Sequence, residues 1–244
     1  MKIALKLRSQ QNQWDQLGRT DPLWAILTEP QKRNGGWDEA AFFATGRNEI
    51  AELMARAVAL GLPALRRTAL DFGCGVGRAT QALAEYFDEV TGVDIAPAML
   101  ERARRYNRHG ERCSYVLNEQ NHLRAFPAAA FDLVYSRITL QHLPPRHIRS
   151  YLMEFMRLVR PGGLLVFQLP DSYRNFRTRI SHGLYGLVAR RLLRRPDVME
   201  MYGIRRERVV ALLEAHGVQL LAIEQDPIAG REWLSWRYFA TLPE

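Results

Sequence analysis

The chain has 244 residues, of which 47% are hydrophobic and 25% are charged. These values are typical of globular proteins and exclude a disordered chain, a collagen-like chain and a disulfide-stapled scaffold. The formal net charge is +8, with 34 Lys and Arg residues against 26 Asp and Glu residues. This excess favours either the binding of polyanions, such as nucleic acid or phosphorylated substrates, or a strongly solvated surface.

The cysteine count and the start of the chain bear on its environment. Cys74 and Cys113 are too few for a disulfide framework or a four-ligand zinc site, so we expect free thiols and no bound metal. Residues 1–8 lack the apolar core of a signal peptide, and no stretch is apolar enough to span a bilayer. We therefore expect a cytoplasmic protein.

The first 64 residues are predicted to form a cap and a helix that pack on the rest of the chain. Residues 1–37 carry turn signals and three tryptophans, and we expect them to be irregular. An amphipathic helix is expected from Asp38 to Gly61, because apolar residues recur there at helical spacing. The tryptophans would either stack on an acceptor molecule or pack into the core; they are Trp14, Trp24 and Trp37.

From Thr68 onward, short apolar strands alternate with helices. Strands with near-continuous apolar runs, separated by helices, indicate a parallel sheet that is covered on both faces. We therefore predict an α/β fold, namely a Rossmann-like, doubly wound and mostly parallel sheet with right-handed crossovers. The expected strands are 69–72, 90–93, 115–117, 131–136 and 164–168, and the expected helices are 79–87, 98–107 and 147–159.

An arginine-rich stretch interrupts this alternation. Ten arginines fall between Arg174 and Arg208, and we predict a helical insertion or lid at about residues 171–203. It could bind a phosphate or carboxylate of the substrate, lie on an anionic membrane, or form a solvated face. The chain then continues with a helix and two strands, expected at 208–216, 218–224 and 235–239.

The first strand runs into a glycine loop, DFGCGVG, at residues 71–77. Glycines let the backbone approach a ligand closely at the carboxyl end of a strand. The next strand ends at Asp94, at the spacing from which a carboxylate reaches the hydroxyls of a ribose. The third glycine comes one residue earlier than in a dinucleotide loop, and Asp71 would repel a pyrophosphate. The loop therefore suits a phosphate-free nucleoside with a cationic end, such as S-adenosylmethionine.

The chain resembles the class I S-adenosylmethionine-dependent methyltransferases over roughly residues 68–170. Three runs carry the resemblance, in the family's order: LDFGCGVGRATQALAEYFDEVTGVDIAPAMLERAR, FDLVYSRITLQHLPP and RPGGLLVFQLP. It implies a methyltransferase core over residues 65–244, with a seven-stranded sheet whose last strand pair is antiparallel. It also implies S-adenosylmethionine as the cofactor and S-adenosylhomocysteine as the product.

The resemblance assigns roles to individual residues. Asp71 and the glycines would lie under the methionine moiety, Asp94 would bind the ribose, and Ile95 would flank the adenine. Two residues after the third strand would contact the adenine edge, and Ser136, Arg137 and Ile138 would line the mouth shared by cofactor and substrate. The complete predicted cofactor-binding set is Asp71, Gly73, Cys74, Gly75, Gly77, Asp94, Ile95, Met99, Asn118, Glu119, Ser136 and Arg137.

Methyl transfer from a sulfonium is an in-line displacement, so the protein positions the reactants. A hydroxyl acceptor also needs a base, because its proton must leave during the attack. His142, just past the fourth strand, is the predicted catalytic base; alternatively it anchors its loop through hydrogen bonds. Asp171 and Tyr173 are weaker candidates.

We predict an O-methyltransferase that acts on a hydroxyl of a sugar, glycan or natural-product small molecule, an anionic one if the arginines bind it. An N- or C-methyltransferase acting on a small molecule is the alternative. An RNA methyltransferase or a non-catalytic cofactor-binding scaffold is less favoured. Nucleic acid is not an expected partner, because no RNA-binding module is visible and residues 136–139 lack the tetrad of amino-directed nucleic-acid enzymes.

Overall fold

The computed structural model describes residues 2–174 and 199–243. Within these residues, seven strands form one sheet in the order β3-β2-β1-β4-β5-β7-β6. Strands β1 to β5 run parallel, and β7 is antiparallel to both of its neighbours. This arrangement confirms the predicted sheet and its antiparallel last pair. The strands are β1 (Thr68–Phe72), β2 (Glu89–Asp94), β3 (Cys113–Leu117), β4 (Phe131–Ser136), β5 (Val159–Tyr173), β6 (Gln219–Gln225) and β7 (Trp233–Thr241).

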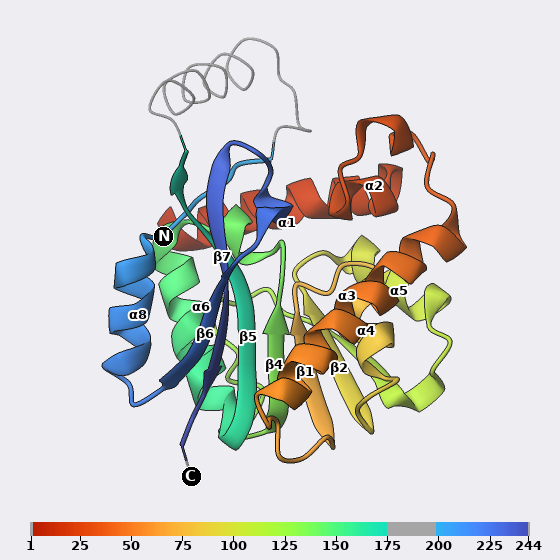
Figure 1. Cartoon of the computed structure of the whole chain (residues 1–244). Helices are drawn as coiled ribbons and strands as arrows, with labels where there is room; N and C mark the ends of the chain where they lie inside the picture. The colour runs from red at the N-terminus through yellow and green to blue at the C-terminus, as the bar shows by residue number, and fades with distance from the viewer. Residues whose placement is uncertain (1, 175–198, 244) are drawn as a thin grey trace.

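Helices cover both faces of the sheet (Figure 1). Leu70 and Phe72 of β1 pack in a core with α6 and α8, whereas Ala69 packs in a second core with α3, α4 and α5. Alternate residues of a strand thus serve opposite faces. In the described part of the chain, no helix is both long and apolar enough to cross a membrane. The helices are α1 (Lys2–Thr20), α2 (Pro22–Ile26), α3 (Glu39–Ala59), α4 (Arg78–Leu83), α5 (Pro97–Tyr106), α6 (Pro145–Leu158) and α8 (Arg206–Glu214).

The expectation that residues 1–37 are irregular is wrong, because most of this segment forms α1 and α2. Most residues of α1 are polar, so the helix depends on tertiary contacts. Leu17 packs in a third core with Phe42 and Met99. The Asp15 carboxylate accepts a hydrogen bond from the Ala98 backbone N–H at 2.7 Å, in the first turn of α5, where negative charge is favoured by the helix dipole.

Two further boundaries refine the prediction. Asp38 caps α3, because its side chain accepts a hydrogen bond from the Ala41 backbone N–H at 2.8 Å. Strand β5 continues to Tyr173, which pairs with Trp233 of β7, so the stretch predicted as an insertion begins as strand. Residues 175–198 of that stretch lie outside the described residues.

Candidate functional site

A pocket lies at the carboxyl ends of β1, β2 and β4. Its lining comes from the loops that follow these strands and from α1, α2 and α3, and α1 crosses over this end of the sheet (Figure 1). The pocket holds about 1030 Å³ of space, its open mouth included, which is enough for a ligand of drug size. It lies where the strand order reverses, the place at which open α/β sheets bind ligands.

The glycine loop presents bare backbone to this pocket. Gly73 has a φ of +79°, and a Cβ there would lie 2.1 Å from the Thr139 side chain. Gly75 has a φ of +52°, and a Cβ there would lie 2.6 Å from Ile26 of α2. Both the conformation and the available space therefore require glycine. A ligand can approach the backbone of the loop between these two positions.

Asp94 is held at the end of β2 by the loops beside it. Its two carboxylate oxygens accept hydrogen bonds from the backbone N–H groups of Gly75, at 2.9 Å, and Ala96, at 2.8 Å. Burial raises the pKa of Asp94, and these hydrogen bonds oppose the rise. Each oxygen retains a lone pair for a further donor. The carboxylate is thus fixed in the pocket wall and able to accept from a pair of hydroxyls.

Asp71 lies at the opposite side of the glycine loop and is 3% exposed. The Thr80 hydroxyl donates a hydrogen bond to its carboxylate at 2.6 Å. Burial raises the pKa of Asp71 to about 7, although the hydrogen bond and the nearby Arg78 guanidinium act in the other direction. A cationic ligand group beside this carboxylate would favour its ionised form.

The residues predicted to flank the adenine, together with Met99 of the cofactor-binding set, fall into two groups. Ile95, Met99 and Asn118 line the pocket, and the Asn118 amide donates to the Tyr151 hydroxyl at 3.3 Å. Glu119 does not line the pocket; it is exposed and accepts a hydrogen bond from Gln11 at 2.6 Å.

Ser136 and Gly77 lie outside the pocket lining and stabilise the segments that form it. The Ser136 hydroxyl is buried and donates to the Phe72 carbonyl at 3.0 Å. Gly77 precedes α4 with a φ of +82°, and a Cβ there would lie 2.6 Å from the Tyr115 hydroxyl. Neither residue is part of the lining, so both shape the loop rather than face a ligand. The predicted residues Cys74 and Arg137 do line it.

His142 lines the pocket with both ring nitrogens in hydrogen bonds. Its Nδ1 lies 3.0 Å from the Glu200 carbonyl oxygen, and its Nε2 lies 3.2 Å from the Gln141 amide nitrogen. A carbonyl only accepts, so Nδ1 carries the proton and Nε2 accepts from Gln141. Burial lowers the pKa of His142 to about 4. The ring is therefore neutral at physiological pH, and Trp14 packs edge-on against it at 5.0 Å.

The other two predicted bases lie elsewhere. The Asp171 carboxylate is 3.6 Å from the Arg205 guanidinium, and the Tyr173 ring packs on Trp233 at 4.0 Å. Neither belongs to the described lining of the pocket.

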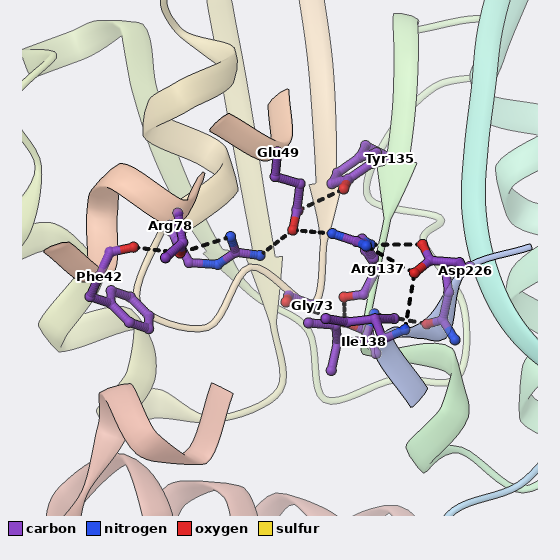
Figure 2. A network of polar contacts seen from close by, with 12 residues as sticks. Phe42, Glu49, Gly73, Arg78, Tyr135, Arg137, Ile138 and Asp226 are labelled. Carbon is purple, nitrogen blue, oxygen red and sulfur yellow. Dashed lines mark hydrogen bonds and ion pairs between the residues drawn. The ribbon is translucent and has the colours of Figure 1, made fainter. Parts of the chain in front are cut away.

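A buried ion-pair network, which the sequence analysis did not identify, forms one wall of the pocket (Figure 2). Glu49 of α3 accepts hydrogen bonds from Tyr135 at 2.7 Å, from Arg78 at 2.9 Å and from Arg137. Arg137 also donates to both carboxylate oxygens of Asp226, each at 2.9 Å. Burial would raise the pKa of Glu49, but the two guanidinium groups outweigh it and hold this pKa below its usual value.

For one member of this network, Glu49, the sequence pattern indicates a buried position. Glu49 lies seven residues after Phe42 and four before Leu53, on the apolar face of α3, and a carboxylate on such a face indicates a buried partner. Asp226 had no comparable signal, because its partner Arg137 is 89 residues away in the sequence.

Part of the chain is similar in sequence to known proteins. Residues 70–167 match the family described as "Methyltransferase domain". Trans-aconitate 2-methyltransferase from Azoarcus sp. (strain BH72) is 34% identical over 161 residues, which are 64% of this chain and 59% of that protein. The enzyme of the same name from Methylobacterium radiotolerans is 40% identical over 124 residues, 50% of this chain and 44% of that one. The chain thus spans about half the length of the curated relatives it matches.

The fold is shared with a solved enzyme. The crystal structure of magnesium protoporphyrin IX methyltransferase from Synechocystis PCC 6803 with bound SAH superposes with a TM-score of 0.67 at 17% identity. The match covers 95% of this chain and 96% of that one. Here the glycine cradle, the fixed Asp94 and the buried Asp71 fit S-adenosylmethionine, the family's cofactor, because they offer a carboxylate to the ribose and another to a cation. Residues 70–167 are therefore similar to a methyltransferase domain, and the chain has the fold of this solved methyltransferase.

Proposed function

We propose that this protein methylates an oxygen of a small carboxylic acid. When bound, the cofactor supplies the electrophilic methyl group, and the chain supplies binding and orientation. One observation carries the proposal: the glycine loop and Asp94 share a continuous pocket with Trp14, Ile138 and His142, residues that a bound nucleoside leaves free for an acceptor.

Each part of the pocket has a task in this proposal. Asp94 binds the ribose hydroxyls, and Asp71 lies near the ammonium group of the methionine moiety. Ile95 and Met99 pack against the adenine, whose edge meets Asn118. The cap formed by α1 and α2 covers the reacting atoms and limits the access of water.

The state of His142 favours a carboxylate acceptor over a hydroxyl. A hydroxyl must lose its proton during the attack, whereas a carboxylate is already ionised at neutral pH. With a pKa lowered to about 4 and with Nε2 already accepting from Gln141, His142 is a weak base for this work. A carboxylate is also attracted by the positive sulfonium in a pocket of low dielectric constant.

The relatives agree with this acceptor class. Trans-aconitate, named for the Azoarcus and Methylobacterium enzymes, is a tricarboxylate without a hydroxyl group. These relatives give no support to the sugar or glycan acceptor expected from the sequence.

The test is transfer of a labelled methyl group from S-adenosylmethionine. The purified chain is offered trans-aconitate and other short di- and tricarboxylic acids, in parallel with sugars and hydroxylated aromatics. We expect label on the acids, in a product that releases methanol in alkali, because methyl esters hydrolyse there and methyl ethers do not. An alkali-stable label on a hydroxyl compound would contradict the proposal.

A hydroxyl acceptor with His142 as its base is the second candidate function, because the ring lines the pocket. His142→Gln separates the two. Loss of a general base lowers kcat by roughly 100- to 10,000-fold, whereas a carboxylate acceptor predicts a change well below this range. Calorimetry with S-adenosylhomocysteine serves as the control, since either role leaves cofactor affinity intact.

A further inference from the structure

Ile138 adopts a backbone conformation that its side chain disfavours. Three non-glycine residues in the described chain have a positive φ: Asn34 at 59°, Ala129 at 51° and Ile138 at 63°. Of these, Ile138 alone has a side chain branched at Cβ, for which the left-handed region is a genuine outlier. Such strain persists only where the surroundings enforce it, and it concentrates at functional sites.

The residues around Ile138 enforce this conformation from both sides. On one side, the Arg137 guanidinium is fixed by Glu49 and Asp226 (Figure 2). The Ile138 backbone N–H itself donates to Gln168 of β5 at 3.1 Å. On the other side, Thr139 donates to the Gly73 carbonyl at 3.3 Å.

Three of the residues that restrain the bend, Glu49, Gln168 and Asp226, lie outside the matched methyltransferase domain. Residues 70–167 contain Arg137 but neither Glu49, which precedes them, nor Asp226, which follows them. The bend at residues 137–139 is thus held in part by segments of the chain that the family domain does not include.

Ile138 lines the pocket and is not among the residues of the three hydrophobic cores. It is half-buried and belongs to the pocket lining, beside Gly73 (Figure 2). Folding alone does not account for an isoleucine here, because glycine or asparagine would adopt the same turn at lower cost. What those residues would lack is a branched apolar group on the acceptor side of the glycine loop.

We propose that Ile138 is a specificity-determining residue for the methyl acceptor, held in its strained bend so that its side chain packs against the carbon skeleton of the acceptor. This inference rests on the proposed function and deepens it. Ile138 limits the size of an acceptor next to the transferred methyl group, so the preferred acids are short and unbranched near the reacting carboxylate.

Two variants distinguish the effect of the Ile138 side chain from the effect of the backbone strain. Ile138→Gly removes both, whereas Ile138→Ala removes the branched group and leaves a Cβ in a left-handed conformation. We expect the glycine variant to have the higher thermal midpoint of the two, because alanine is strained at a positive φ. Both variants should bind S-adenosylhomocysteine within about twofold of the wild-type affinity.

The deciding measurement is the ratio of kcat/KM for succinate to that for 2,3-dimethylsuccinate, a bulkier acid of the same charge that is branched next to both carboxylates. We expect both variants to shift this ratio toward the bulkier acid by roughly tenfold or more, the scale of discrimination by apolar pocket contacts. An unchanged ratio in an active enzyme, or a shift in the glycine variant alone, overturns the role of the side chain. Equal thermal midpoints of the alanine and glycine variants contradict the proposed backbone strain at Ile138. If the wild-type chain methylates neither these acids nor any other, the proposed function fails and the inference falls with it.

Discussion

The cofactor half and the acceptor half of the pocket are built in different ways. Asp71 and Asp94 end two adjacent parallel strands, and short-range backbone geometry sets the loop between them. In the acceptor half, Gln10 of α1 contacts a residue 132 positions away, and Tyr135 contacts Glu49 at a separation of 86. The two carboxylates and the glycine loop of the cofactor half thus come from one short stretch of the chain, whereas the acceptor half is assembled from distant segments.

The two halves also use different interactions. Backbone N–H groups fix the Asp94 carboxylate, so that its position follows directly from the path of the chain. In the acceptor half, the side chains of Glu49 and Arg137 are 7% and 15% exposed, and they form an ion pair. A buried pair contributes little net stability, but removing one partner leaves a charge without compensation. Mutations should thus affect folding in one half and binding in the other.

The largest effect is expected for Glu49→Gln. This change leaves two buried guanidinium groups with one carboxylate fewer, and breaking such a pair costs about 3–5 kcal/mol. Urea unfolding should show this loss in the free energy of unfolding. Glu52→Gln, at an exposed position of the same helix, is the matched control and should change it by less than about 0.5 kcal/mol. Equal effects of the two changes would show that the network is not what joins α3 to the sheet.

A smaller effect, on binding, is expected for Asp94→Ala. Charge-assisted hydrogen bonds are worth about 1.5–3 kcal/mol, so the affinity for S-adenosylhomocysteine should fall roughly 10- to 150-fold in calorimetry. Glu89→Ala changes an exposed acid at the start of the same strand and should leave the affinity unchanged. Wild-type affinity in the Asp94 variant would contradict the ribose role.

The smallest effect concerns pH. Burial raises the pKa of Asp71 from 3.8 to about 7, so the ionised fraction falls about tenfold between pH 8 and pH 6. A cationic cofactor favours the ionised form over the protonated one. Its affinity should therefore fall as the pH drops through 7, by up to about tenfold. Asp71→Asn should remove this dependence, and a slope that survives in that variant would assign it to another group.

Most of the residues that the sequence assigned to the cofactor line the pocket, because the determinants of the glycine loop are local. The run from Asp71 to Asp94 contains the glycines, the acids and the strand endings that shape the loop. The acceptor half was predicted poorly, since most residues of α1 are polar and Asp226 lies 89 residues from its partner Arg137 in the sequence. His142 was placed correctly in the pocket, but the Glu200 carbonyl and the Gln141 amide that fix its protonation come from the folded structure.

The location of Glu49 and Asp226 outside residues 70–167 has a consequence for protein engineering. A fragment cut to the family boundaries would keep Arg78 and Arg137 while losing both of their counter-charges. Such an excised piece, or a chimera that grafts it between foreign flanking segments, would need compensating acids before it could fold. Chimeras among relatives of this chain should fold only when the segments that contain Glu49 and Asp226 come from the same parent as residues 70–167.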